Sequence, residues 1–188
     1  MKSVFLQGEF SNYKIRDLNE SRGEIIKPSY FAQRKVNVFI SHKHDDLDDL
    51  MGLIGFLEKE FNVKAYIDSQ DPAMPRKTSG ETATILKDRI DECDRFILLA
   101  TDGAIESKWC NWELGYGDAK KGKKVALLPL KKLGISYTGN EYMEIYSFIT
   151  YWDGSETYDT GKKVEPGYYV ATRTNKKYTI TPLGEWLS

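Results

Sequence analysis

Apolar residues follow two different spacings along this chain, and the changes from one to the other mark out its expected strands and helices. Four short apolar runs have the composition of buried strands, at residues 36–40, 63–67, 95–101 and 125–130. Between these runs, apolar residues recur every three or four positions, as they do on the buried face of an amphipathic helix. The first helix shows this most clearly, through Leu47, Leu50, Ile54, Leu57 and Phe61.

Capping residues and charges indicate where the expected helices begin. Asp45 and Asp46 fall in the expected first turn of the first helix, where the helix dipole favours negative charge. Thr78 and Glu81 have capping-box spacing and predict the start of the second helix. Ser107 is expected to cap a third helix that ends near Ala119. The predicted buried stripe of the second helix consists of Ala83, Leu86, Ile90 and Cys93.

This alternation of strands and helices is typical of a mostly parallel sheet with helices on both faces. After residue 130 the pattern weakens to a short helix at 142–146, a last sheet strand at 148–152 and a hairpin around residues 175–177. We therefore expect an N-terminal arm at 1–34, one α/β domain at 35–152, and a C-terminal hairpin extension at 153–188 packed on that domain.

The amino-acid composition excludes several classes of protein. Of the 188 residues, 40% are hydrophobic and 29% are charged, which predicts a packed core rather than a disordered chain. The formal net charge of −1 argues against a dedicated nucleic-acid binder. The longest apolar runs are far shorter than the roughly 20 residues that a membrane span needs. We expect no signal peptide, no membrane association, a cytoplasmic protein, and reduced thiols at Cys93 and Cys110.

The third helix carries the most distinctive pair of side chains. Trp109 and Glu113 lie four residues apart and therefore share one face of that helix. A carboxylate beside an apolar ring is partly desolvated, and desolvation favours unusual chemistry. Taken alone, however, a core tryptophan next to a solvated surface acid explains this pair better.

Four short segments change that interpretation because of their order. They read Val-Phe-Ile-Ser-His at 38–42, Tyr-Ile-Asp at 66–68 before a long loop at 69–80, Asp-Arg-Phe-Ile-Leu-Leu at 94–99, and Ser-Lys-Trp-Cys-Asn-Trp-Glu-Leu at 107–114. In this order and in this strand–helix context, they resemble the TIR (Toll/interleukin-1 receptor) domain family, in its stand-alone prokaryotic type. The resemblance covers residues 35 to about 130.

The resemblance implies a flavodoxin-like α/β fold and, as in many members, cleavage of the bond between nicotinamide and ribose in NAD. Glu113 matches the catalytic glutamate of the family's Trp-x-x-x-Glu motif, and Ser41, His42 and Lys43 match its ligand-facing loop. Trp109 is expected either to contact the substrate or only to pack. The loop at 69–80 corresponds to the BB loop, which gates the site and takes part in assembly.

The expected chemistry needs only one carboxylate. Hydrolysis of an ordinary glycoside uses two carboxyl groups, one of which protonates the leaving oxygen. Nicotinamide departs from NAD as a neutral molecule, so no general acid is required and Glu113 alone can stabilise the oxocarbenium-like centre. Lys43 and the amides of its loop can hold the diphosphate. NAD is thus a substrate, no metal or other cofactor is expected, and the product is ADP-ribose or a cyclic or otherwise modified derivative.

Other functions compete with NAD cleavage. A non-enzymatic TIR scaffold that assembles through the BB loop stays open, although a scaffold does not need Glu113. A dehydrogenase is disfavoured because no Gly-x-Gly-x-x-Gly turn follows the first strand. His42 and His44 are expected to be solvated rather than metal ligands, and Asp68 to cap the BB loop. The expected partners are NAD, further copies of the chain, and a separate effector that senses the product in anti-phage defence.

Overall fold

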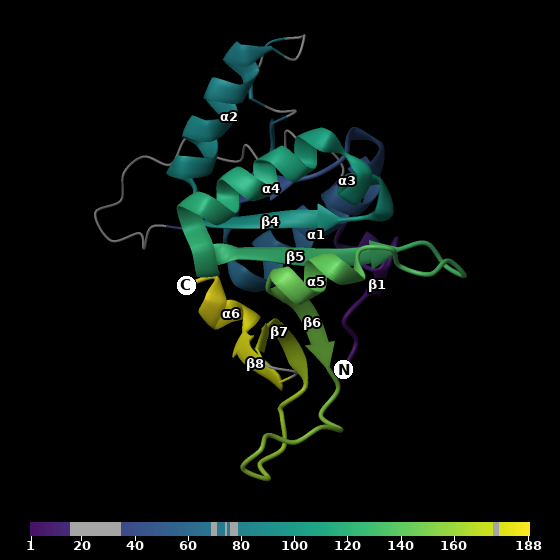
Figure 1. Ribbon diagram of the computed structural model, residues 1–188. Helices are drawn as coiled ribbons and strands as arrows, with labels where there is room; N and C mark the ends of the chain where they lie inside the picture. The colour runs from purple at the N-terminus through teal and green to yellow at the C-terminus, as the bar shows by residue number, and fades with distance from the viewer. Residues whose placement is uncertain (16–34, 69–70, 74, 76–78, 175–176) are drawn as a thin grey trace.

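One mixed sheet forms the centre of the molecule (Figure 1). The computed structural model describes residues 1–15, 35–68, 71–73, 75, 79–174 and 177–188. The strands are β1 (Phe5–Leu6), β2 (Asn37–Ser41), β3 (Lys64–Tyr66), β4 (Arg95–Ala100), β5 (Val125–Lys131), β6 (Phe148–Trp152), β7 (Gly167–Thr174) and β8 (Lys177–Pro182). The helices are α1 (Leu47–Phe61), α2 (Gly80–Glu92), α3 (Asp102–Glu106), α4 (Lys108–Lys121), α5 (Asn140–Ile145) and α6 (Leu183–Trp186).

The strand order is β3-β2-β4-β5-β6-β7-β8, and β1 pairs with β5. The neighbouring strands from β3 to β6 are parallel. Numbered in chain order from β2, these five strands run 2-1-3-4-5, which is the flavodoxin-like order. The predicted α/β fold is therefore confirmed, as is the C-terminal hairpin of β7 and β8.

The hairpin belongs to the central sheet itself. β7 pairs antiparallel with β6, which places Ala171 opposite Phe148, and β8 pairs with β7. The prediction that residues 148–152 form the last sheet strand is therefore wrong. The sheet continues beyond β6 because Val170 and Ala171 of β7 are apolar and become buried when β7 pairs with β6.

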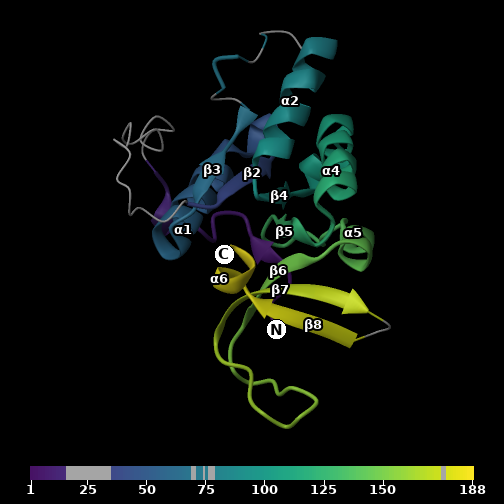
Figure 2. The ribbon, with the colours of Figure 1, turned by 90° about the vertical axis from the view of Figure 1, so that its left-hand side faces the viewer.

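The two faces of the sheet have separate hydrophobic cores. Figure 2 shows α1 on one side of the sheet and α2 and α4 on the other. On one side, α1 packs with residues of the N-terminal segment; on the other side lie α2 and α4. Successive strand residues point to opposite faces, so Ile40 joins the α1 core while Phe39 joins the α4 core. The Phe39 ring stacks between Tyr66 and Phe96, at centroid distances of 5.3 and 5.4 Å. The same alternation directs Ser41 to the α4 side.

Several helix boundaries differ from the sequence predictions, among them the starts of α1 and α2. Asp45 and Asp46 lie in a 3₁₀ turn, His44–Asp46, ahead of α1, because Asp46 N–H bonds to the carbonyl of Lys43. The capping box at α2 joins Ser79 to Thr82, one residue later than expected, and Thr78 lies outside the described residues. Thr82 is accordingly buried, and Ala83 is only half-buried.

Two further differences lie around α4. The sequence analysis did not predict α3, whose five residues are too few to show a hydrophobic period; the Thr101 side chain caps it by accepting from Ala104 N–H. α4 itself continues to Lys121, two residues beyond the predicted end, and Gly122 closes it with a positive φ of 50°. The predicted cap at Ser107 is confirmed.

The first fifteen residues pack against the domain. Phe5 and Phe10 are buried in the α1 core, and a 3₁₀ turn at Ser11–Tyr13 crosses α1. Two glycines of α1 make this crossing possible, because a Cβ at Gly52 would lie 2.8 Å from the carbonyl oxygen of Phe10. Residues 16–34, the rest of the predicted arm, lie outside the described residues.

Two sequence expectations concern the chain as a whole. Cys93 and Cys110 are both free and buried, as predicted. Among the residues that the structure describes, no helix has the length and apolar character that crossing a membrane would require.

Candidate active site

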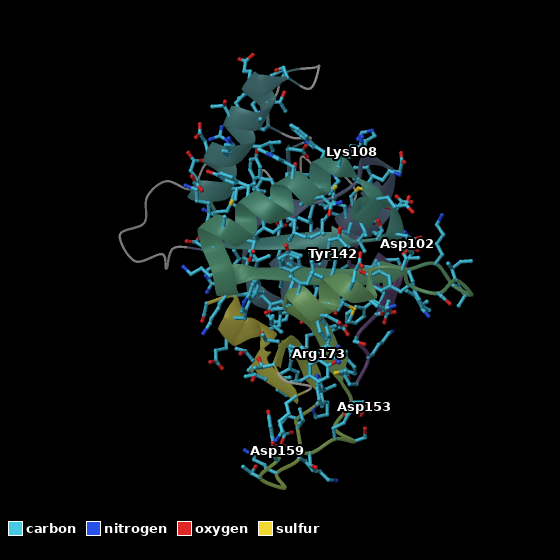
Figure 3. The ribbon with its side chains drawn as sticks, in the orientation of Figure 1. Asp102, Lys108, Tyr142, Asp153, Asp159 and Arg173 are labelled. Atoms are coloured by element: carbon cyan, nitrogen blue, oxygen red, sulfur yellow. The ribbon has the colours of Figure 1, made fainter. Side chains whose placement is uncertain are left out.

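A buried glutamate lies where α4 passes over the end of β2. α4 begins at the sheet edge to which β4 and β5 point, near Lys108 and Asp102 in Figure 3. Its second turn carries Glu113, whose exposed fraction is 4%. Ser41 is the last residue of β2, is equally buried, and donates a hydrogen bond from Oγ to Glu113 Oε2 at 2.5 Å. The acid is therefore part of the interior, contrary to the surface position that the bare sequence favoured.

Burial dominates the electrostatics of Glu113. It raises the pKa of the carboxyl group from 4.5 to about 8, and the charge of Asp68 contributes to the rise, while the hydrogen bond from Ser41 opposes it. Within the described ranges, none of the groups that act on Glu113 is a cation. A buried carboxylate without a cationic partner destabilises the folded protein, so proteins keep such groups mainly where function requires them. The site suits a ligand that brings positive charge.

His42 lies on the same side of the site as Asp68. Its side chain is only 4% exposed, and Nδ1 lies 3.3 Å from the carbonyl oxygen of Ile40 and 4.0 Å from Asp68 Oδ1. The expectation of a solvated His42 is therefore wrong, because the ring folds back over its own strand. His44 is exposed, as predicted. Within the described part of the chain, no group of three His, Cys, Asp or Glu residues could hold a metal ion.

Lys43 points to a different cavity. Its Nζ lies 3.3 Å from Asp45 Oδ2, and its side chain rests against the first turn of α3, beside Gly103. It lines a cavity of about 460 Å³ together with Thr101 and Leu130, whereas neither Ser41 nor Glu113 is among the described lining residues. The structure thus brings Ser41 and His42 to the Glu113 region but places Lys43 along the sheet edge, and its role toward a substrate stays a prediction.

Trp109 begins a row of stacked rings along α4. Its ring lies 5.0 Å from that of Trp112, and Trp112 stacks on Tyr116 at 6.1 Å. Lys87 of α2 lies over both Trp112 and Tyr116, at 5.8 and 5.7 Å from the ring centroids. Trp109 is half-buried against the α4 core. Packing of Trp109 is therefore observed, and its contact with a substrate stays a prediction.

Cys110 follows Trp109 but has the character of a core residue. Burial raises the pKa of its thiol, and the nearby charge of Glu113 raises it further, although hydrogen bonds involving Ser107 and Ser41 act in the opposite direction. A thiolate is therefore disfavoured at neutral pH. Cys110 therefore has the environment of a packed thiol and not that of a nucleophile.

The segment that leaves β3 is tied to α2 through Asp71. Tyr66 Oη donates to Asp71 Oδ2 at 2.8 Å, Arg89 Nε donates to the same oxygen at 2.7 Å, and Ala73 N–H donates to Oδ1 at 2.9 Å. Burial alone would raise the pKa of Asp71, but these bonds outweigh it and the pKa lies below its ordinary value. Asp71 thus joins residues 71–73 to both β3 and α2.

Removing Arg89 tests this anchor. We expect Arg89→Ala to lower the free energy of unfolding by about 1–2 kcal/mol, because it leaves the buried Asp71 without its cation while part of the guanidinium bond is screened by solvent. Urea unfolding monitored by circular dichroism measures the loss. Glu92→Ala is the matched control: Glu92 is an exposed partner of the same guanidinium, and its loss should cost no more than about 0.5 kcal/mol. Equal losses in the two variants would contradict the anchor.

Sequence reasoning assigned Asp68 only a capping role, and it missed the link between α4 and α5. In that link, Asn111 Nδ2 donates to the carbonyl of Ile105 at 2.6 Å, and Asn111 Oδ1 accepts from Tyr142 Oη at 2.6 Å. The available signal for Asp68 was its position directly after β3, the strand that pairs with β2 and so ends near Ser41 and His42. Nothing in the spacing of Asn111 and Tyr142, which are 31 residues apart, indicates their pairing.

Comparison with known proteins identifies relatives of this chain. A family model for the TIR domain matches residues 38–162, a segment that includes Ser41, His42 and Glu113. A Bacillus cereus (strain MSX-D12) protein named "Probable 3' cyclic ADP-D-ribose synthase ThsB'" is 33% identical over 138 residues, which cover 70% of each chain. A Cytobacillus dafuensis protein named as a candidate cyclic ADP-D-ribose synthase, TIR2, is 31% identical over 95 residues, covering 48% of this chain and 25% of that protein.

Proposed function

The chain belongs to the TIR domain family, and on that premise we propose that it cleaves NAD at the nicotinamide–ribose bond, with Glu113 as its catalytic residue. The observation that carries the proposal is the burial of Glu113 beside Ser41, where no cation among the described residues shifts its pKa. NAD supplies the missing positive charge, first as the pyridinium ring and then as the oxocarbenium-like ribose. An interaction scaffold does not need a buried carboxyl group, which destabilises the folded protein when it is charged.

The reaction follows from the charges. As the bond between ribose C1 and the pyridinium nitrogen breaks, nicotinamide takes the electron pair and leaves as a neutral molecule. Positive charge moves to the ribose, where the carboxylate of Glu113 stabilises it inside a site of low dielectric constant. Ser41 fixes the carboxylate through its hydrogen bond. In this proposal His42 and Trp109 contact the substrate, Lys43 meets the diphosphate along the sheet edge, and no cofactor or metal takes part.

The names of the relatives support a cyclising enzyme. We propose a cyclic ADP-ribose as the principal product, with ADP-ribose formed when water captures the same centre. Such a product would serve as a signal to a separate effector in anti-phage defence. Incubation of concentrated protein with NAD, followed by chromatography of nicotinamide and of the nucleotide products, tests this proposal. Absence of nicotinamide, even from protein clustered on a surface, would contradict it.

The pH dependence of the reaction should report the state of Glu113. We expect kcat/KM for nicotinamide release to rise about tenfold per pH unit below pH 8 and to level off above it, because the free protein must lose the proton from a carboxyl group whose pKa lies near 8. Initial rates at low NAD concentration between pH 6 and 9.5 measure this profile. A rate that is flat between pH 6 and 8 would show that Glu113 is already charged in the free protein, or that it takes no part.

Self-association is the second part of the proposal, and exposed apolar side chains support it. Leu133 and Ile135, two residues apart in the loop after β5, are 83% and 52% exposed, so together they offer apolar area that another protein surface could cover. We propose that copies of the chain assemble through such surfaces and through the segment at 69–80. If assembly occurs without any NAD cleavage, the scaffold interpretation replaces the enzymatic one.

A further inference from the structure

A second carboxylate faces the same site as Glu113. In the parallel pair of β2 and β3, Phe39 lies opposite Tyr66, and their stacked rings show that both point to the α4 side. Ser41 ends β2, and Asp68 follows β3 just beyond the paired residues. Asp68 Oδ1 lies 4.0 Å from Nδ1 of His42, the residue after Ser41. Ser41 is hydrogen-bonded to Glu113, so Asp68 and Glu113 lie on either side of the Ser41–His42 segment.

The two acids differ in their surroundings. Glu113 is 4% exposed and hydrogen-bonded to Ser41, whereas the side chain of Asp68 is 37% exposed, with the imidazole of His42 at 4.0 Å. The charge of Asp68 contributes to the raised pKa of Glu113, as expected for acids in one site. Two carboxyl groups in different environments are suited to different tasks: the buried one to stabilise a cation, and the more exposed one to exchange a proton.

We propose that Asp68 is the base for the cyclising step, and that His42 positions it. The inference rests on the proposed cleavage of NAD. When the ribose C1–nitrogen bond breaks, the oxygen of a hydroxyl group on the adenosine-side ribose forms the new bond to C1. The proton of that hydroxyl passes to the carboxylate of Asp68 and from there to water, so no oxidant, reductant or further reactant is needed. His42 is held against the end of β2 and limits the orientations open to Asp68.

The order of the two events makes this role separable from cleavage. Loss of nicotinamide depends on Glu113, because positive charge builds up on the ribose before the new bond is complete. Capture depends on which nucleophile is best placed. A hydroxyl oriented and deprotonated by Asp68 competes with water, which needs no such placement because it is abundant at an open site. Without the base, the cation is still formed but is captured mainly by water.

The test compares products as well as rates. We expect Asp68→Asn to lower the ratio of cyclic to linear ADP-ribose at least about tenfold, while nicotinamide release falls less than about threefold. Asp68→Glu, which restores a carboxylate, should recover part of the cyclic product. Asp88→Asn is the control, because Asp88 is an exposed acid on the outer side of α2 and should leave the ratio unchanged. Thermal unfolding of each variant establishes that it is folded.

The outcomes distinguish this inference from the function on which it rests. An unchanged product ratio in Asp68→Asn overturns the role of Asp68 and leaves NAD cleavage intact. The same holds if the variant loses nicotinamide release as severely as it loses cyclic product, or if the unaltered protein forms only linear ADP-ribose. Absence of nicotinamide from the unaltered protein overturns the proposed function and the inference together.

Discussion

Glu113→Gln is expected to reduce nicotinamide release by at least about 100-fold while making the folded protein more stable in alkaline solution. The loss of activity follows because a neutral amide cannot stabilise the positive charge that develops on the ribose, and removing one such electrostatic partner costs about 10²–10³ in rate. The gain in stability follows because the carboxylate of Glu113 is 4% exposed and, in the part of the chain that the structure describes, no cation acts on it.

The sign of the stability effect can be worked out from the pKa. Between the ordinary value of 4.5 and about 8, folded protein holds a proton on Glu113 that unfolded protein has released. Stability of the unaltered protein therefore falls as pH rises through this window, by about 1.4 kcal/mol per pH unit for this one group. Glutamine does not titrate. The difference in unfolding free energy between variant and parent should therefore shift by about 2–3 kcal/mol in favour of the variant between pH 6 and pH 9.

Urea unfolding at the two pH values, on both proteins, measures this shift, because all other titrating groups are shared and cancel. Ser41→Ala is the companion variant: it removes the hydrogen bond to Glu113 Oε2 but leaves the carboxyl group in place. It should keep the pH dependence of stability and lose less activity than Glu113→Gln. A Glu113→Gln protein with the pH dependence of its parent would show that this glutamate is not the buried, protonated acid.

Parallel strands are the part of this fold that a sequence reveals best. β4 and β5 are covered on both faces, so nearly every residue is apolar, and both were predicted within one residue. The bounds of α1 follow equally well from its period, from Leu47 to Phe61. The features that were predicted wrongly depend on residues that are distant in the sequence and adjacent only in the fold. β7 was recognised as a strand, but its pairing with β6 is set by the register between Phe148 and Ala171, which no local pattern records.

The candidate active site shows the same contrast between features that the sequence indicates and features that only the fold determines. The resemblance to the TIR family singled out Glu113 and Ser41, and the structure brings these two side chains into one hydrogen bond. The burial of Glu113 was not predictable from its helix, since an acid one turn after a tryptophan is more often solvated. Burial results from the position of α4 over the end of β2. His42 was misjudged for the same reason: whether a loop imidazole faces water depends on Asp68 and Ile40, which come from the folded site.

Gly55 on α1 is the position where the smallest change should cost the most stability. A Cβ atom there would lie 1.9 Å from the carbonyl oxygen of Tyr13, a backbone atom that cannot rotate aside. Alanine is a better helix former than glycine, so helix propensity alone would favour the substitution by up to about 1 kcal/mol. The folded protein can relieve the overlap only by lifting the 3₁₀ turn at Ser11–Tyr13 away from α1, which exposes Phe10.

We therefore expect Gly55→Ala to lower the free energy of unfolding by about 3–5 kcal/mol. This value is the stabilisation lost when Phe10 and its neighbours become exposed, less the gain in helix propensity. Gly115→Ala is the control, because Gly115 lies in α4 with nothing within 4 Å of its missing Cβ, and this variant should be as stable as its parent or more so. Urea unfolding measures both. The arm packs on the α1 face whereas Glu113 lies on the α4 face, so nicotinamide release per folded molecule should be preserved in Gly55→Ala. Equal stability of the two alanine variants would mean that the turn at Ser11–Tyr13 does not pack against Gly55 in solution.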